Sequence, residues 1–525
     1  MTRNVPRYLI YLIFFGLIFL FESAPGYMDA DYYAANGVRI AAGLRGQGDP
    51  WAEPFLWHYL DDPQGLPHPS FSYWMPLPAW LGALGALLIP LGERAVRLPF
   101  VLLSAAVPLI SAALAWAFTR RRESAVLAAF LALFSGFYLP FLPTSDAFSP
   151  LMLMGGAFFL LLMPASPDQA RLSEGGTSLL LGVLVGLLHL TRAEGLLWLV
   201  VGGATVWQRF HWGSTGKGRW WRYGAVFAAG YLLTAGPWML RNLLVFGTPV
   251  SPVGARALWW RAYDELYAYP ASLLTPAHLL SGGWGEILRA RLWALGQNLQ
   301  TALAVQGSIF LLPLMLMGAW RLRRQPAVQI AMLAWGALLA VMTLLFPFAG
   351  ARGGFFHAGA AVQPLLWALA PVGLESFIEW GGRHRNWQAA RAGTFFRTGL
   401  IVLAALLSGL LLMQRVVLSD WGGSEAHYRQ VEAALQAQGA LPQDVVMVNN
   451  PPGYVLSTGR AAIAVPYGDV DTMLAVARRY GARYLVLEQN YRGGPLDSLY
   501  DRPPAALRLL THVGDTLLFV VEGEE

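Results

Sequence analysis

Residues 97–122 read RLPFVLLSAAVPLISAALAWAFTRRR, and no charged side chain interrupts the run between Arg97 and Arg120. A helical apolar run of this length matches the hydrocarbon thickness of a lipid bilayer. The three arginines that follow are typical of a cytoplasmic loop at the end of a membrane span. This stretch therefore predicts a spanning helix whose last turn lies on the cytoplasmic side.

The rest of the chain has the same character. Its 525 residues are 56% hydrophobic and only 13% charged, whereas an ordinary globular protein has roughly 25% charged residues. The apolar residues come in long blocks, which a globule of this size could not bury. The positive charges sit in short loops between those blocks, so they do not indicate a nucleic-acid partner. The sequence predicts an integral membrane protein.

Eleven apolar segments are candidate spans, and the first of them is expected to be an uncleaved helix near the N-terminus. With eleven spans, the N-terminus lies inside the cell and the C-terminus outside. The well-marked basic clusters then all fall on the cytoplasmic side, as the distribution of Lys and Arg in membrane proteins requires. The candidate spans are residues 8–23, 97–118, 124–142, 148–164, 177–190, 195–208, 223–240, 299–320, 327–348, 357–378 and 398–415, and the basic clusters are 120–122, 217–219, 321–324 and 383–385 with Arg391 and Arg397.

This topology leaves three sizeable segments outside the cell: 24–96, 241–298 and 416–525. The last one changes character, because helical and strand patterns alternate there. We expect helices at 424–438 and 471–480, strands at 445–448, 461–466 and 483–488, an Asn-Pro-Pro-Gly turn at 450–453, and a final hairpin around Gly514-Asp515. The sequence therefore predicts an all-α membrane domain over 1–415 and a small extracytoplasmic α/β domain over 416–525.

Candidate chemistry is richest directly after the first span, where Tyr27-Met28-Asp29-Ala30-Asp31-Tyr32-Tyr33 occurs. On a helix over 29–43, Tyr32 and Tyr33 share a face with Asp29, whereas Asp31 points away. Asp29 could be a simple helix cap on an interfacial helix. Alternatively, both carboxylates could reach one cation at the start of the helix.

A second group of polar residues follows within 51–78. Histidine together with Asp or Glu can make a metal site. These residues have no fixed ligand spacing, however, so the interpretation as solvated loop residues stays open. The group consists of Glu53, His58, Asp61, Asp62 and His68.

Five motifs, in this order, resemble those of GT-C glycosyltransferases, the group that includes protein O-mannosyltransferases and the lipid A aminoarabinose transferase. The first is similar to the Asp-Glu-Ala-Tyr-Tyr signature of that group, and the second to its Lys-Pro-Pro-x-Tyr-Tyr-Trp motif. The resemblance covers about residues 1–380. The motifs are Asp29-x-x-Tyr32-Tyr33, His68-Pro69-x-x-x-Tyr73-Trp74, Arg97-Leu98-Pro99, Thr144-Ser145-Asp146, and Gly236-Pro237-Trp238 with Arg241.

Two residues depart from the family pattern. Ala30 stands where the second acid is usual, although Asp31 could replace it, and His68 stands where the family often has Lys. These departures leave both the use of a metal and the identity of the donor open.

The resemblance implies a glycosyltransferase of the bacterial inner membrane. Such an enzyme moves a sugar from a polyprenyl phosphate or diphosphate to a lipid, glycan or protein acceptor on the outer face, usually with inversion. It implies Asp29 as the base that takes the proton of the acceptor hydroxyl. Asp31 would bind a cation such as Mg²⁺ or Mn²⁺, with His68 as a second ligand, or position the sugar. Tyr32, Tyr33 and Asp146 would contact substrate, although Asp146 could instead cap the fourth span.

Arginine suits the phosphate of such a donor because its charge is permanent and its donors form a rigid fork. Five arginines are predicted outside or near the outer boundary: Arg192, Arg241, Arg256, Arg261 and Arg352. Three of them are the candidates for a site: Arg192, Arg241 and Arg352. Arg192 could equally pair with nearby Glu194. Arg352 is the strongest of the three, since its flanking glycines allow a ligand to approach the backbone closely.

Two other classes of protein remain as alternatives. A transporter places ionisable residues at mid-membrane and often contains repeats, whereas here these residues concentrate in the outer loops and no repeat is visible. A membrane scaffold would need its tail but not Asp29.

Overall fold

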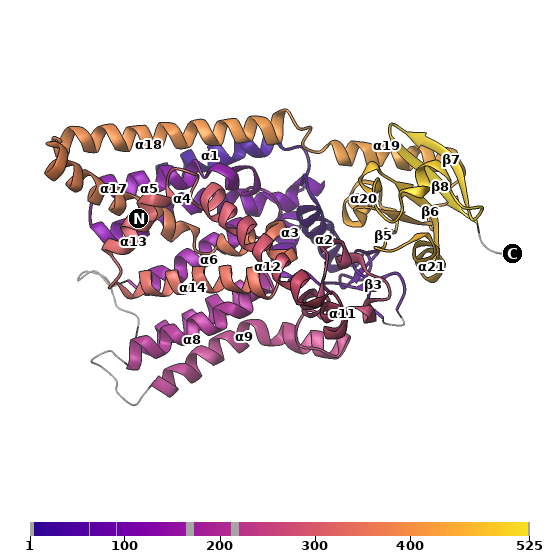
Figure 1. Cartoon of the computed structure of the whole chain (residues 1–525), viewed down its shortest axis with the longest axis horizontal. Helices are drawn as coiled ribbons and strands as arrows, with labels where there is room; N and C mark the ends of the chain where they lie inside the picture. The colour runs from indigo at the N-terminus through magenta and orange to yellow at the C-terminus, as the bar shows by residue number, and fades with distance from the viewer. Residues whose placement is uncertain (1–4, 62–63, 91, 164–172, 212–219, 523–525) are drawn as a thin grey trace.

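The computed structural model describes residues 5–61, 64–90, 92–163, 173–211 and 220–522. A bundle of helices makes up most of the molecule, and a mixed sheet lies at one end of it (Figure 1). The helices of the bundle are α1 (Val5–Phe21), α4 (Leu98–Thr119), α5 (Arg122–Leu133), α6 (Phe148–Leu161), α7 (Glu174–Thr191), α8 (Gly195–His211), α9 (Trp220–Phe246), α12 (Gly283–Gln300), α13 (Leu312–Arg321), α14 (Pro326–Leu344), α16 (Phe355–Gly359), α17 (Gln363–Arg385) and α18 (Ala389–Leu412).

Each predicted span coincides with helix in the structure, but several spans are short or broken. Within the described ranges, four helical stretches are long and apolar enough to cross a membrane: Gly92–Thr119, Glu174–Thr191, Pro326–Leu344 and Ala389–Val417. A fifth is added if the bent pair Pro347–Gly359 and Gln363–Arg385 counts as one span. The count of eleven therefore stays a prediction.

The breaks have local causes. The segment 124–142 changes from α5 to a 3₁₀ turn over Gly136–Phe141, and Gly136 adopts a φ of 61° there. The segment 299–320 changes to a π-turn at Thr301–Gln306, after which Ser308 and Ile309 both have positive φ. Hydropathy does not report these changes of backbone direction, because the side chains around them remain apolar.

Small residues allow the helices of the bundle to approach closely, as is common between membrane helices. In the contact between α13 and α17, a Cβ atom added to Gly373 would lie 1.8 Å from the backbone oxygen of Leu314. A Cβ atom on Gly318 would lie 2.1 Å from the backbone oxygen of Leu369. Glycine is therefore required on both sides of this helix pair.

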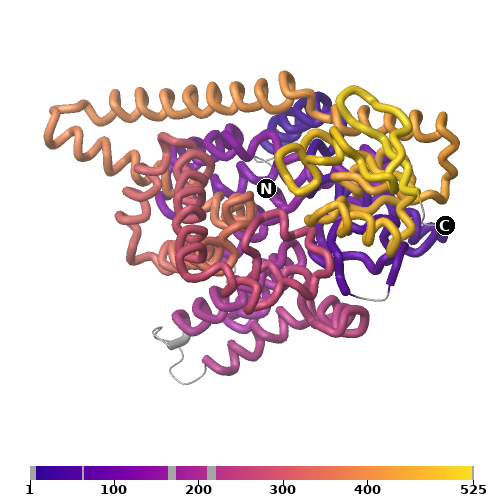
Figure 2. Tube along the Cα trace, turned by 45° about the vertical axis from the view of Figure 1, so that its right-hand side comes forward, coloured from indigo at the N-terminus to yellow at the C-terminus, as the bar shows by residue number. Residues whose placement is uncertain are grey.

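The two ends of the bundle differ. The turn between α17 and α18 lies at the end opposite the sheet in both views (Figures 1 and 2). The last turn of α17, which leads into it, contains the basic residues 383–385. The observed arrangement therefore places this basic cluster and the C-terminal sheet at opposite ends of the helices.

A layer of shorter elements covers the end that carries the sheet. Helix α2 (Met28–Leu44) packs against α3 (Leu77–Leu88), and the short strands β1 (Ala52–Glu53) and β3 (His68–Pro69) pair beside them. The rest of this layer consists of α10 (Pro252–Arg256), α11 (Pro276–Ser281) and α15 (Pro347–Ala349). Helix α2 carries the acidic motif.

The sheet has six strands in the order β2-β5-β4-β6-β8-β7. Strands β2, β5, β4 and β6 run parallel, and β8 and β7 add an antiparallel hairpin. Strand β2 comes from the first outer segment, so the sheet is not built by the tail alone. The elements are β2 (Phe55–Leu56), α19 (Gly423–Ala437), β4 (Val445–Val448), α20 (Pro451–Thr458), β5 (Ala462–Ala464), α21 (Val470–Tyr480), β6 (Ala482–Leu487), α22 (Ser498–Asp501), β7 (Leu507–Val513) and β8 (Thr516–Val521).

The Asn-Pro-Pro-Gly stretch is the start of α20 and not a turn, so this prediction was wrong. The side chain of Asn450 caps the helix by accepting from the backbone N–H of Gly453. Pro451 occupies the first helical position, where its missing N–H costs nothing. Asn followed by Pro therefore initiates a helix here.

Candidate active site

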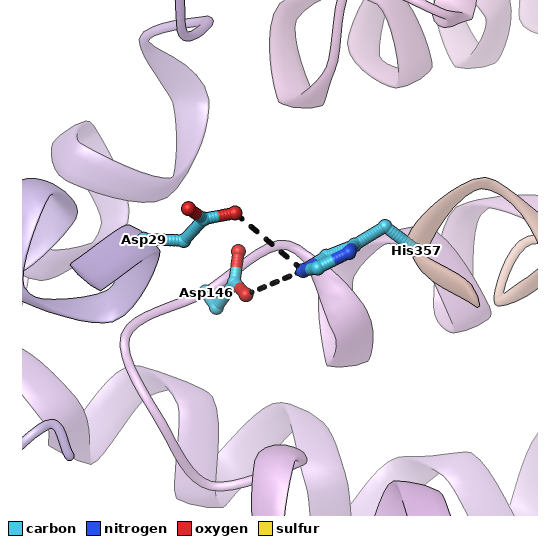
Figure 3. Close-up of side chains that lie close together, drawn as sticks. All are labelled: Asp29, Asp146 and His357. Carbon is cyan, nitrogen blue, oxygen red and sulfur yellow. Dashed lines mark hydrogen bonds and ion pairs between the residues drawn. The ribbon is translucent and has the colours of Figure 1, made fainter. Parts of the chain in front are cut away.

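Three side chains from separate elements point toward one another (Figure 3). His357 on α16 places its Nε2 3.0 Å from Asp146 Oδ2 and 3.7 Å from Asp29 Oδ2. Asp29 belongs to the first turn of α2, and Asp146 lies in the loop just before α6. Two carboxylates therefore face one imidazole nitrogen.

Asp29 does not cap its helix. The N-cap position of α2 is Tyr27, and no side chain there makes a capping bond. Asp29 instead faces the histidine, while the Tyr27 hydroxyl donates to Asp146 Oδ2 over 2.8 Å. The start of α2 therefore contributes both a carboxylate and a hydrogen-bond donor to the site.

Asp146 is fixed on two further sides. Its Oδ1 accepts from the backbone N–H of Ala147 over 2.6 Å. The neighbouring Ser145 hydroxyl donates to the backbone oxygen of Ala30 over 2.8 Å, which ties this loop to α2. The distance between the two carboxylates is thus set by the packing of α2 on the 143–147 loop.

The tautomer of His357 follows from its other nitrogen. Nδ1 lies 2.9 Å from the backbone oxygen of Gly353, and because a carbonyl can only accept, Nδ1 must carry a proton. Nε2 is therefore the ring nitrogen that faces the two carboxylates. A histidine held in this way by a backbone carbonyl is the usual arrangement of a metal ligand.

Asp29, Asp146 and His357 could hold a metal ion, since one ligand atom from each lies within 4.8 Å of the others. This is the candidate cation site of the described residues, and it contains neither Asp31 nor His68. The side chains of Asp31 and His68 have other surroundings, given below, and their role as metal ligands stays a prediction.

The two carboxyl groups differ in their electrostatics. Burial raises the pKa of Asp29, and the negative charge of Asp146 raises it further, while His357 and Arg192 act in the opposite direction. Burial also acts to raise the pKa of Asp146, but His357 and Arg192 together hold it below its usual value. Asp146 is thus the more acidic of the two carboxyl groups, and Asp29 is the one more ready to take a proton.

The site opens into a cavity of about 510 Å³. Asp29, Tyr33, Arg192 and Arg352 line it together with His357. Apolar residues of α14, among them Leu338 and Met342, line it as well. Polar and charged groups from the outer layer therefore meet the apolar interior of the bundle in one space.

Arg192 lies deep in this cavity. Its guanidinium contacts Glu194 at 2.9 Å, and its Nη1 lies 3.9 Å from Asp29 Oδ2. That Nη1 is buried and has no hydrogen-bond partner in the described part of the chain. The local ion pair with Glu194 thus exists, but it leaves one donor of Arg192 unused beside the carboxylates.

Arg352 is the exposed cation of the cavity. It lies in a kinked turn over Gly350–Gly354, where Gly353 adopts a φ of 123° that only glycine tolerates well. Its guanidinium lies 5.4 Å from the centre of the Tyr263 ring. The glycines predicted to allow close approach therefore create the kink that presents Arg352.

Five predicted site residues do not line this cavity: Asp146, which contacts His357 beside it, and four residues that lie elsewhere. Asp31 accepts a hydrogen bond from Asn450 of α20, and the Tyr32 hydroxyl donates to Glu53. His68 sits in β3 opposite Glu53, and its Nδ1 contacts the backbone oxygen of Pro69. Arg241 lines a second cavity of about 700 Å³, where its guanidinium stacks on Trp238 and Phe246.

His357 was not predicted as a site residue. It lies 211 positions after Asp146 in the sequence, so spacing alone could not join the two. The sequence feature that could have identified it is an ionisable residue at the start of an apolar helix, directly after the glycine-rich stretch around Arg352. A polar side chain in such a place is expected to have a partner or a function.

The fold resembles solved structures of membrane glycosyltransferases. ArnT from Cupriavidus metallidurans bound to undecaprenyl phosphate superposes with a TM-score of 0.56 and 14% identity, over 100% of this chain and 99% of that one. The archaeal oligosaccharyltransferase AglB from Archaeoglobus fulgidus, in complex with an inhibitory peptide and a dolichol-phosphate, gives 0.55 and 14%, over 91% and 69%. The A. fulgidus enzyme in complex with Zn and sulfate gives 0.53 and 15%, over 91% and 67%.

No family model and no curated protein sequence matches this chain. The resemblance to GT-C glycosyltransferases is therefore confirmed in the fold and not in sequence identity. The fold alone does not identify a substrate, so the activity must be argued from the site.

Proposed function

We propose that this protein is a glycosyltransferase that moves a sugar from a polyprenyl-phosphate or diphosphate donor to an acceptor on the outer face of the membrane, with inversion. The observation that carries this proposal is the cavity in which Asp29, Arg192 and Arg352 meet the apolar wall of α14. Solved structures of the same fold contain dolichol-phosphate and undecaprenyl phosphate. An amphiphile with an anionic head and a long apolar tail fits such a space.

Asp29 is the proposed base. Its Oδ2 faces His357, and its carboxyl also accepts a hydrogen bond from the Trp74 side chain. The proposed role of this carboxylate is to accept the proton of an acceptor hydroxyl. A general base works best when its pKa lies near the working pH, and burial raises the pKa of Asp29 in that direction. Inversion follows if the acceptor oxygen attacks the sugar on the face opposite the departing phosphate.

The leaving phosphate is the proposed partner of the two arginines. Arg192 offers an unused buried Nη1, and Arg352 stands exposed at the kinked turn. Positive groups already in place stabilise the charge that grows on the leaving oxygen. Arg192 would hold the phosphate next to Asp29, while Arg352 would attract it into the cavity.

The residues present also fit a divalent cation. Asp146 and His357, with Asp29, would hold Mg²⁺, Mn²⁺ or Zn²⁺, because two carboxylates and an imidazole are common ligands of such ions. When bound, the cation would act as a Lewis acid toward the phosphate. The proposed location is the outer face of the bacterial inner membrane, with the C-terminal sheet outside.

The first test is turnover. The purified full-length protein is reconstituted in lipid and offered a panel of polyprenyl-phosphate sugars, with cell-envelope acceptors and Mg²⁺ or Mn²⁺ present. We expect one donor to be consumed, and Asp29→Asn to lower kcat by at least about 100-fold. Asp31→Asn is the matched control, since it makes the same change two residues away and outside the cavity.

The outcomes separate the alternatives. Turnover that persists in Asp29→Asn would retain the enzyme class but remove Asp29 as the base. Absence of turnover with every donor would contradict the proposed activity.

A further inference from the structure

Asn450 and Asp31 join two parts of the molecule that are far apart in sequence. Asn450 Nδ2 donates to Asp31 Oδ2 over 2.8 Å, across 419 positions of the chain. Asp31 lies in the first turn of α2, two residues after Asp29. Both side chains are buried, so losing this bond would leave a buried polar group without its partner.

The orientation of the Asn450 amide is set by a second bond. Its Oδ1 caps α20 by accepting from the backbone N–H of Gly453 over 3.1 Å. The amide has only one oxygen, so the NH₂ group must be the one that faces Asp31. A Cβ atom on Gly453 would lie 2.8 Å from Asp31 Oδ2. A side chain at position 453 would therefore displace the hydrogen-bonded pair of Asn450 and Asp31.

A second connection runs through the sheet. The backbone N–H of Ala462 in β5 donates to the backbone oxygen of Pro54, which precedes β2. Glu53, one residue earlier, accepts from the Tyr32 hydroxyl over 2.6 Å and from Asn36 Nδ2 over 3.1 Å. The C-terminal sheet therefore reaches α2 by two separate routes.

The surroundings of Asp31 make the Asn450 bond important. Glu425 of α19 and Asp29 of α2 both act on Asp31 as like charges. Asn450 is the group that acts in the opposite direction, since it donates to the carboxylate. On the far side of α2, Ser145 holds the backbone of Ala30. The first turn of α2 thus lies between the Asp146 loop and the C-terminal region.

We propose that Asn450 is a positioning residue: through Asp31, it holds the first turn of α2 so that Asp29 faces His357 and the cavity. The C-terminal region is then a fixed support for the active site. The catalytic consequence of this role rests on the proposed function of Asp29, whereas the structural consequence does not.

An exchange of the two side chains tests this proposal. Asn450→Asp keeps a cap for Gly453 but places a second carboxylate against Asp31. Asp31→Asn keeps a hydrogen bond, because the new amide can present its oxygen to Asn450 Nδ2. The double variant D31N/N450D restores an amide-to-carboxylate bond with the roles exchanged.

Two readouts are taken on the full-length protein in lipid nanodiscs. Amide hydrogen exchange over residues 28–36 reports the order of the first turns of α2, and kcat with the active donor reports the position of Asp29. For Asn450→Asp we expect exchange about tenfold faster and kcat about tenfold lower. Asp31→Asn and the double variant should exchange no more than about threefold faster than the wild type and keep kcat within about threefold of it.

Asn449→Asp is the matched control, because it adds the same charge one residue earlier. Its side chain accepts from Tyr491 and bonds the Glu488 carboxylate, both inside the C-terminal region, so exchange over 28–36 should not change. An equal effect in this control, or failure of the double variant to restore slow exchange, would overturn the positioning role. If no donor is turned over, the exchange data still decide this proposal, so its failure is distinguishable from that of the proposed function.

Discussion

Asp29 and Asp31 stand two positions apart on one helix and have different surroundings. Asp29 faces an imidazole, an arginine and a cavity, whereas Asp31 faces an amide from another part of the fold. Successive helical positions differ by roughly 100° around the axis, so residues two apart cannot share a face. The acidic motif therefore contains one group that contacts the candidate site and one that anchors the helix.

The buried carboxyl of Asp31 should lower the stability of the folded protein as the pH rises toward neutral. Burial raises the pKa of Asp31 to about 7, well above the value of about 3.9 in an unfolded chain. Below pH 4, the protonated Asp31 makes its full contribution to the stability of the folded protein. This contribution is lost as the pH rises through 7. Asp31→Asn removes this loss, so the variant should gain stability relative to the wild type between pH 4 and 7, by up to about 4 kcal/mol, and stay level above that.

Thermal unfolding of both proteins in detergent between pH 5 and 8 measures this difference. A gap in Tm that does not widen with pH would show that Asp31 is not titrating in this range.

His357 should control the affinity for a divalent cation. His357→Ala removes one of three ligands, and we expect the Kd for Mn²⁺ to rise by at least about tenfold. Calorimetric titration of the protein in nanodiscs measures it. His278→Ala is the control, because this ring pairs with Glu265 away from the cavity. Equal Mn²⁺ affinity in wild type and His357→Ala would remove the cation site from these three residues.

At the scale of the elements, the close packing of α13 against α17 leads to a prediction about the stability of glycine variants. Gly373→Ala forces α13 and α17 apart, since the new Cβ would lie 1.8 Å from the Leu314 carbonyl oxygen. We expect a loss of about 1–3 kcal/mol. Gly336→Ala on α14 meets nothing within 4 Å and should be neutral or slightly stabilising. Thermal unfolding of the two alanine variants compares them directly.

The sequence predicted elements well where one local pattern decides the structure. The length of the apolar runs located the helices. The alternation of helical and strand patterns along the C-terminal region located β4, β5 and β6. The start of α20 was misread because Asn-Pro-Pro-Gly suits both a turn and a helix N-terminus. Strand β2 was missed because two residues carry no pattern, and its pairing with β5 depends on a segment some 400 positions away.

The candidate site was predicted in part for the same reason. Motifs pointed to Asp29 and Asp146, and the search for a phosphate-binding arginine pointed to Arg192 and Arg352. The fold brings Asp29, Arg192 and Arg352 together in one cavity and places Asp146 beside it, against His357. The motifs did not reveal His357, whose importance depends on the carboxylates that the packing of α2 and α16 places beside it. Likewise, the sequence did not reveal that Asp31 and Asp29 have different surroundings, because the contact of Asp31 with Asn450 is visible only in the fold.

At the scale of the whole molecule, the arrangement of the two ends predicts the orientation in the membrane. The basic turn between α17 and α18 lies at one end of the bundle and the C-terminal sheet at the other (Figure 1). Positive residues favour the cytoplasmic side, so the sheet and the cavity beside it should face outward. A lipid-linked donor would then meet its acceptor outside the cell.

The chain contains no cysteine, so single cysteines report this orientation without background. Gln388→Cys, at the start of α18, and Gln438→Cys, at the end of α19, are exposed positions at the two ends. In sealed spheroplasts, a membrane-impermeant maleimide should label Gln438→Cys at once and Gln388→Cys only after permeabilisation. The reverse pattern would invert the topology and place the candidate site in the cytoplasm, where the proposed outer-face transfer could not occur. Labelling of both positions in sealed cells would place the two ends on one side, which the helix arrangement does not permit.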